Sequence, residues 1–159
     1  MFNISQTNYA VLSFSLILSF YLFLSCTNSD NQDTQTKRNA EIENAYKEVM
    51  RKHDEVMPKI SDIRLLQKKL REEMEKDSIA SDSLKKENIL ELLSKLKKAD
   101  DAMFDWMNEF KNPHLNQEFY LKSKDEELLD YLKSEDKKIE VVANQMLESI
   151  QLSKKLLNK

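Results

Sequence analysis

The 159-residue sequence contains no glycine and only two prolines. Glycine normally supplies the positive-φ positions of tight β-turns, bulges and phosphate-binding loops, so sheets and nucleotide-binding loops are difficult to build without it. Helices need no such positions. The remaining composition, 40% hydrophobic and 33% charged residues, is typical of a globular or coiled-coil protein. We therefore expect an all-α fold, and the length corresponds to one domain.

The sequence has no large excess of charge of either sign, because 25 basic and 28 acidic residues give a net charge of −3. The two signs are closely mixed along the chain. This pattern is typical of a solvated surface and provides no basic patch for a phosphate backbone. A nucleic-acid partner is therefore not expected.

Residues 1–25 contain no charged side chain. Their apolar part, residues 10–24, includes three serines and is shorter than the roughly 20 residues that cross a bilayer. Such a length is typical of the hydrophobic region of a secretory signal. We predict that residues 1–25 are a signal peptide and that the chain is exported.

Cys26 is the only cysteine, so an exported chain could not use it for an internal disulfide. The sequence Phe23-Leu24-Ser25-Cys26 resembles the lipobox of bacterial lipoproteins. The resemblance implies cleavage between Ser25 and Cys26, acylation of Cys26 with palmitate-like chains, and membrane attachment through this lipid. It also implies the cell envelope of a Gram-negative bacterium, with Thr27 favouring the outer membrane. An uncleaved anchor and an ordinary signal peptide are the alternatives.

Residues 27–38, TNSDNQDTQTKR, contain no aliphatic or aromatic side chain that could pack on a core. We predict that residues 26–38, the lipidated cysteine and the polar residues after it, form a flexible tether. A dozen flexible residues reach on the order of 20 Å. The tether would hold a folded body, residues 39–159, close to the membrane.

Three hydrophobic stripes with helical spacing predict the fold of residues 39–159. The first belongs to a helix from about Asn39 to about Lys76, with Pro58 on its solvent side causing a kink rather than a break. Its members are Ile42, Tyr46, Val49, His53, Val56, Ile60, Ile63, Gln67, Leu70 and Met74. The second helix has Asp82 or Ser83 as its N-cap and ends before Pro113. Its stripe is Ile89, Leu92, Leu96, Ala99, Met103, Trp106 and Phe110.

The third helix is predicted to begin at a capping box, Ser123 to Glu126, and to run to about Leu157. Its stripe is Leu128, Leu132, Ile139, Ala143, Met146, Ile150 and Leu157. Before it, Phe119, Tyr120 and Leu121 are expected to fold back onto the end of the body. The most economical arrangement is an antiparallel up-down-up three-helix bundle with long coiled-coil-like helices.

The stretch MRKHDEVMPKI, residues 50–60, suggests a binding site because a helix would bring its histidine and two methionines together. In an antiparallel hairpin, facing residues of the first two helices have numbers that add up to about 160. One layer should then contain Met50, His53, Met57, Met103, Trp106 and Met107. Ordinary core packing explains these residues most simply. A soft-ligand site for Cu(I), less readily a haem, or a pocket for a small apolar ligand is the alternative.

Other candidate residues point to no chemistry. Asp101, Asp105 and Glu109 are interpreted as a solvated helix face, and His114 as an exposed loop residue. The C-terminal Lys159 is only a weak candidate for attachment to peptidoglycan. We find no metal-protease, haem-attachment, phosphate-loop or di-iron motif. No catalytic residue, metal or cofactor is therefore expected beyond the covalent lipid, and an enzyme is not expected.

The segments HDEVMPK, residues 53–59, and ADDAMFDWMNEF, residues 99–110, resemble a family of small bacterial lipoproteins often labelled viral A-type inclusion protein-like. The resemblance extends over most of residues 26–159 and implies a lipid anchor with a helical body. It implies no catalytic role. We expect an envelope protein that acts as a structural or protein-interaction module, with another envelope protein as its partner.

Overall fold

The computed structural model describes residues 29–76 and 82–158 of the chain. They form helices α2 (Ser29–Val56), η1 (Met57–Lys59), α3 (Ile60–Met74), α5 (Ser83–Glu109), α6 (Gln117–Lys122) and α7 (Asp125–Leu157). The chain divides into two units, residues 1–40 and 41–159. The packing described below is that of the second unit. Its described residues include no β-strand, which confirms the all-α prediction.

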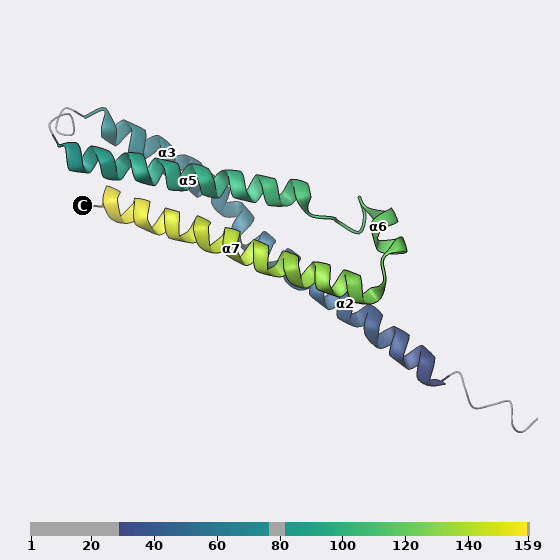
Figure 1. The fold of residues 1–159 in the computed structure, drawn as a ribbon. Helices are drawn as coiled ribbons and strands as arrows, with labels where there is room; N and C mark the ends of the chain where they lie inside the picture. The colour runs from purple at the N-terminus through teal and green to yellow at the C-terminus, as the bar shows by residue number, and fades with distance from the viewer. Residues whose placement is uncertain (1–28, 77–81, 159) are drawn as a thin grey trace, which may run out of the picture. The chain divides into compact units, whose positions relative to one another are not determined.

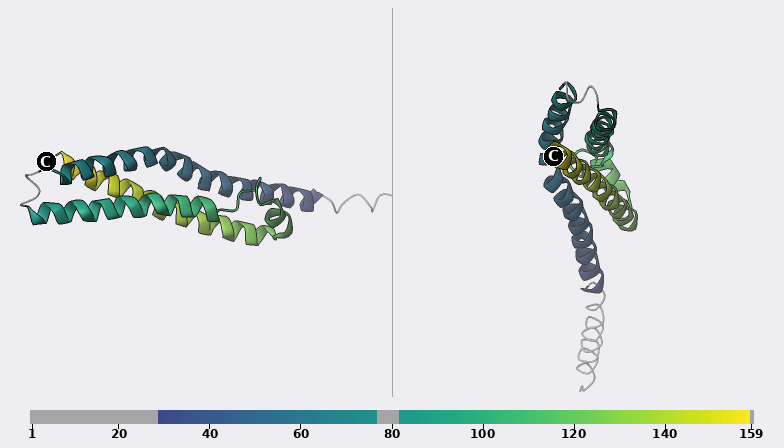
Figure 2. Two further views of the ribbon diagram at one scale, coloured as in Figure 1. Left: turned by 90° about the horizontal axis from the view of Figure 1, so that it is seen from above. Right: turned by 90° about the vertical axis from the view of Figure 1, so that its left-hand side faces the viewer.

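Helices α3, α5 and α7 each pack against the other two. Figure 1 shows α5 and α7 running alongside one another in opposite directions, and Figure 2 shows the same pairing from two further sides. Each helix has an apolar stripe that would be unfavourable in water, and mutual packing buries all three stripes in one core. This core consists mainly of aliphatic side chains.

The stripe predicted for the second helix is confirmed, because six of its residues are buried in α5 and the seventh, Phe110, is buried at its C-cap. The first stripe needs one correction. Leu66 is buried where Gln67 was predicted, and Gln67 is half-buried. A step of three from Ile63 reaches Leu66, and a step of four reaches Gln67, so both residues lie near the packed face of the helix. The apolar side chain of Leu66 occupies the buried position.

The third stripe is mostly correct, although Ala143 and Leu157 are half-buried rather than buried. The prediction missed four buried residues of α7: Glu135, Val142, Ser149 and Ser153. Three of them are polar, and a search for apolar periodicity passes over such positions. The Ser149 hydroxyl is satisfied locally, because it donates a hydrogen bond of 2.9 Å to the carbonyl of Met146.

Helix α2 begins earlier than the sequence predicted. It starts at Ser29, so residues 29–38, predicted as a flexible tether, are helical in the structure. The prediction considered only the missing apolar side chains. These residues also contain no proline or glycine, and extending an existing helix is much less costly than nucleating a new one.

The predicted kink at Pro58 is confirmed. The proline lies in η1, a single 3₁₀ turn between α2 and α3, and its side chain is exposed. The chain keeps a helical conformation on both sides, with Val56 and Ile60 in the right-handed α region. Figure 2 shows the resulting bend between α2 and α3. Proline removes one backbone donor, so the tighter turn accommodates it without unwinding the helix.

The helix caps agree with the sequence at α5 and differ at α7. Asp82 caps α5 and accepts a hydrogen bond of 3.0 Å from the backbone N–H of Lys85. For α7 the predicted box from Ser123 to Glu126 is wrong by one residue. The N-cap is Lys124, whose backbone N–H donates to the Glu127 carboxylate at 3.1 Å. This contact is one half of a capping box. The acidic side chains in the first turn of α7 also stabilise its N-terminus through the helix dipole.

The connection between α5 and α7 contains the short helix α6, which the sequence did not predict. Phe119 and Tyr120 are half-buried and fold back as expected, with the ring of Phe119 5.2 Å from that of Tyr131. Leu121 does not, because its side chain is 84% exposed. A six-residue helix can turn only one of its faces toward the body, and Leu121 lies on the other face.

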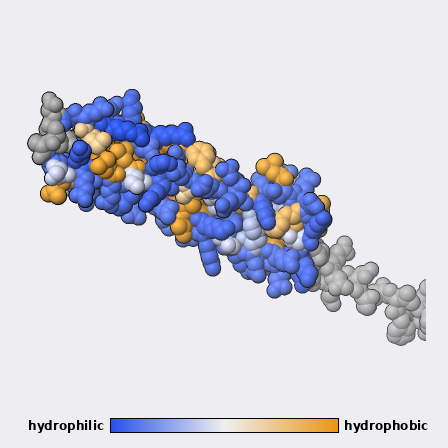
Figure 3. Space-filling view, turned by 45° about the horizontal axis from the view of Figure 1, so that its top comes forward, coloured by the Kyte–Doolittle hydropathy of each residue, from blue (hydrophilic) through white to orange (hydrophobic). Residues whose placement is uncertain are grey.

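Within the described ranges, no helix has a stretch both apolar and long enough to cross a bilayer. The predicted signal peptide, Ser25, Cys26 and Lys159 lie outside the described residues. The visible surface of the body is largely hydrophilic, with hydrophobic side chains in separate groups (Figure 3). Asp101, Asp105, Glu109 and His114 are exposed as predicted.

Candidate functional site

The six residues of the predicted layer all lie in or against the core. Met103 and Trp106 are buried, whereas Met50, His53, Met57 and Met107 are half-buried. The rings of His53 and Trp106 are in contact, with centroids 5.5 Å apart and a tilt of 30°. The antiparallel hairpin therefore places the histidine beside the tryptophan, as the sequence numbering predicted.

His53 is held by its neighbour in the sequence. Its Nδ1 atom lies 2.8 Å from a carboxylate oxygen of Asp54, and its side chain is only 15% exposed. A carboxylate accepts a hydrogen bond from Nδ1–H, so in the neutral ring the free electron pair is on Nε2. This arrangement fits either a packed core histidine or a metal ligand whose orientation is fixed by a second residue.

The surroundings of Trp106 favour packing. The indole stacks on Phe110 with centroids 4.8 Å apart, and only 5% of the residue is exposed. Its Nε1 atom has no hydrogen-bond partner among the described residues. Burying that unpaired donor is unfavourable, so the apolar contacts of the ring must offset the loss. No group of three or more His, Cys, Asp or Glu side chains in the described ranges could hold a metal.

An aromatic cluster continues from Trp106 toward the α5–α7 connection. We define it as Tyr46, Trp106, Phe110, Phe119, Tyr120 and Tyr131. Phe110 lies at its centre, 6.1 Å from the ring of Tyr46 on α2 and 6.3 Å from that of Tyr131 on α7. Helix α2 thus adds the ring of Tyr46 to the aliphatic side chains, among them Val49 and Val56, that it contributes to the core.

Three tyrosine hydroxyls of this cluster hold the segment that leaves α5, two through its backbone and one through a side chain. Tyr131 accepts a hydrogen bond of 2.6 Å from the N–H of Lys111, and Tyr120 donates one of 2.8 Å to the carbonyl of the same residue. Tyr46 accepts from the Asn112 side chain at 3.2 Å. Sequence patterns did not predict this arrangement, because the three tyrosines lie on three different helices and meet only in the folded chain.

One charged residue, Lys52, links α2 to α7 in the same region, and a second, Glu135, is buried on α7. Lys52 of α2 contacts Asp136 of α7 at 2.8 Å and Glu140 at 3.1 Å, and the Asp136 carboxylate raises the pKa of Lys52. Glu135 is 3% exposed and accepts a hydrogen bond of 2.8 Å from Lys138, which raises the pKa of Lys138. The Lys52 contacts therefore hold α2 against α7, whereas the contact between Glu135 and Lys138 lies within α7.

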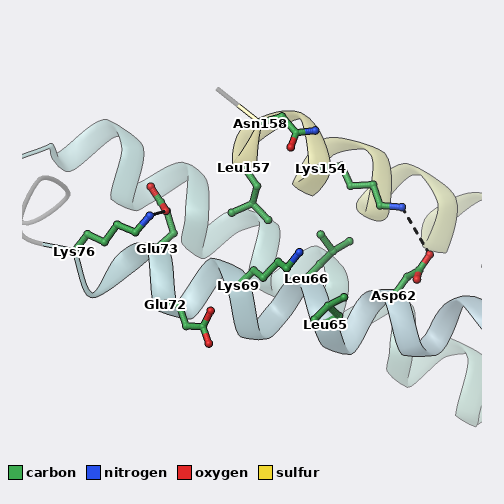
Figure 4. Close-up of a pocket in the computed structure, with 10 residues that line it drawn as sticks. All are labelled: Asp62, Leu65, Leu66, Lys69, Glu72, Glu73, Lys76, Lys154, Leu157 and Asn158. Atoms are coloured by element: carbon green, nitrogen blue, oxygen red, sulfur yellow. Dashed lines mark hydrogen bonds and ion pairs between the residues drawn. The ribbon is translucent and has the colours of Figure 1, made fainter.

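A groove of about 510 Å³ lies between α3 and α7 at the other end of the body (Figure 4). Leu157 of α7 points toward α3, where Leu66 and Lys69 lie. Lys154 pairs with Asp62 across the groove at 3.7 Å. The remaining lining residues are Leu65, Glu72, Glu73, Lys76 and Asn158. An apolar floor between charged side chains of both signs is suited to binding a peptide or a helix.

The groove was not predicted, because it depends on where α7 ends relative to α3. Leu65, one turn from the seam, is 50% exposed at its edge. A second groove, of about 610 Å³, lies between α5 and α7 and has leucines from both helices in its lining. Comparison with protein-family models, with curated proteins and with solved structures gives no significant match.

The buried tyrosines predict a loss of stability at high pH. Burial raises the pKa of Tyr131 to about 12, and burial also raises the pKa of Tyr120. An unfolded chain loses these protons near pH 10, so between about pH 10 and 12 the folded state binds more protons than the unfolded state. The free energy of unfolding should therefore be nearly constant from about pH 7 to pH 9 and fall above about pH 10.

Denaturant unfolding at a series of pH values checks this expectation, and Tyr131→Phe is the matched variant. It retains the ring but loses the hydroxyl that accepts from Lys111, which costs about 1 kcal/mol at neutral pH. Its stability should then decline less steeply above pH 10. Identical slopes for the two proteins would show that Tyr131 does not contribute to the alkaline loss.

Proposed function

We propose that this chain is a lipid-anchored cell-envelope protein whose helical body acts as a structural or protein-interaction module. The body would be an antiparallel up-down-up three-helix bundle, held at the membrane through lipid on Cys26. The mutual packing of α3, α5 and α7 supports the bundle. The charge-free residues 1–25, followed at once by the only cysteine, support the anchor.

The α3–α7 groove is the observation that carries the interaction role. It lies far from residue 41, where the chain enters the body, because the rise from there to Lys69 is about 40 Å along the helix. A partner could thus bind there while the anchor stays in the membrane. The proposal assigns no catalytic role to the body and needs no cofactor other than the lipid.

Site-specific photo-cross-linking in cells tests this role. A photoreactive amino acid at position 65 lies at the edge of the groove, whereas one at position 90 lies outside the two grooves described here. Leu65 and Leu90 are matched controls because both are 50% exposed. We expect position 65 to give one discrete cross-linked product that position 90 does not. If the two positions give the same products, or none, the groove does not bind a partner.

Binding of Cu(I) or a small apolar ligand at the predicted layer is the second candidate function. One observation favours it, namely the contact between His53 Nδ1 and Asp54, which leaves Nε2 free to accept a metal. Thioethers of Met50 and Met57 would complete a soft-ligand set. A copper-dependent rise in melting temperature would separate this candidate from ordinary packing.

A further inference from the structure

Two leucines in the α5–α7 connection are exposed to an unusual degree. Leu115 is 85% exposed and Leu121 is 84% exposed, compared with 72% for Leu84 near the start of α5. Figure 3 shows hydrophobic side chains standing at the surface at this end of the body. A single exposed leucine needs no explanation, whereas two in one short connection point to an interaction surface.

The connection that presents these leucines is fixed to the body. The backbone N–H of Asn112 donates to the side chain of Asn116 at 2.9 Å, and Phe119 packs edge-on against Tyr131. The tyrosine hydroxyls described above hold Lys111 from both sides. Leu115 and Leu121 are therefore held at defined positions, although they make few contacts with the body themselves.

The connection lies at the end of the body that is nearest to residue 41. The Asn112 side chain donates to Tyr46 at 3.2 Å, and Tyr46 stacks on Phe110. The helical residues 29–41 span about 18 Å. Within the proposed function, the connection therefore lies at the end of the body that is nearest to the anchoring membrane. The opposite end of the body is about 40 Å farther along the helix.

The charges around the connection nearly balance. They are Lys111, Glu118, Lys122, Lys124, Asp125, Glu126 and Glu127. Electrostatic attraction to anionic lipid would thus be weak, and contact with a membrane would depend on the leucines. Lysine side chains at such a surface can keep their ammonium groups among the lipid headgroups while their methylene stems contact apolar atoms.

We propose that residues 110–124 rest on the surface of the bilayer that carries the Cys26 lipid, with Leu115 and Leu121 inserted at the boundary of headgroups and acyl chains. This inference rests on the proposed lipid anchor. Two leucines bind a bilayer weakly by themselves, but the anchor keeps them at a high local concentration near it. The contact would direct the α3–α7 groove away from the membrane.

Fluorescence quenching by brominated lipid tests the contact. The full-length lipidated protein is reconstituted into phosphatidylcholine vesicles with or without brominated acyl chains. Leu115→Trp and Leu121→Trp are compared with Leu84→Trp, an exposed position at the opposite end of α5. Trp106 is present in every variant, and its signal in the wild type is subtracted. We expect strong quenching at positions 115 and 121, none at position 84, and the same result in high salt.

Four results would overturn the contact. Equal quenching at positions 84, 115 and 121 would show that the body lies on the membrane without a preferred end. A blue shift of the added tryptophans without quenching would show that a second protein copy covers the leucines instead of lipid. Absence of quenching in protein that floats with the vesicles would refute the contact and leave the anchor intact. Protein that does not float at all would refute the anchor and the contact with it.

Discussion

Cys26→Ala should abolish incorporation of labelled fatty acid and release the protein from the membrane fraction or leave its signal uncut. The sequence contains no other thiol that could be acylated. Each buried methylene of an acyl chain contributes about 0.8 kcal/mol to membrane binding, so two or three chains hold a protein almost permanently. Losing them removes nearly all attachment. Metabolic labelling with a fatty acid, followed by cell fractionation, measures the effect.

Ser19→Ala is the matched control for this experiment. It changes one polar residue in the same apolar segment and leaves Cys26 in place. We expect it to be labelled and fractionated as the wild type is. Equal labelling of wild type and Cys26→Ala would contradict the lipoprotein proposal, and the membrane contact of residues 110–124 would then lose its basis.

Helix α5 shows which parts of the fold can be predicted from a sequence. Its stripe is apolar at all seven positions, Asp82 supplies a strong N-cap, and the residue before Pro113 avoids the helical region. Every one of these local preferences favours the same helix. At the start of α2 the local preferences conflict. The absence of apolar side chains favours a flexible tether, whereas the absence of proline and glycine allows a helix.

The candidate site was predictable only where it follows from helix spacing. The contact of His53 with Trp106 follows from antiparallel pairing of two helices at a given turn. By contrast, burial of Glu135 depends on Lys138 as its partner, and the tyrosine hydroxyls bind a backbone segment whose path no periodicity describes. Grooves and end contacts depend on helix lengths to within one turn. Sequence patterns seldom fix helix ends so closely.

Trp106→Ala should destabilise the body by about 3–5 kcal/mol, which is a large part of the stability of a domain of this size. Only 5% of Trp106 is exposed, and its ring stacks on Phe110 and contacts the tilted ring of His53. Removing it leaves a cavity between α2 and α5 that these rings can fill only in part. Denaturant unfolding followed by far-ultraviolet circular dichroism measures the loss.

Substitutions that preserve volume distinguish packing from ligand binding in this layer. Met50→Leu and Met57→Leu should each cost less than about 1.5 kcal/mol if the methionines only fill space. Both are half-buried, so leucine fits without a new cavity. Under the same interpretation, Cu(I) leaves the melting temperature unchanged, since no group in the folded protein prefers it.

The result that would contradict ordinary packing is a copper-dependent rise in melting temperature that disappears in His53→Ala. A ligand that binds only the folded state raises its stability, and His53 supplies the one nitrogen ligand of the layer. His53→Ala also removes a ring contact, so its melting temperature falls without metal. The decisive quantity is therefore the difference with and without Cu(I) within each protein. We expect this difference to be zero in the wild type, because Trp106 and the methionines already fill the space around the imidazole.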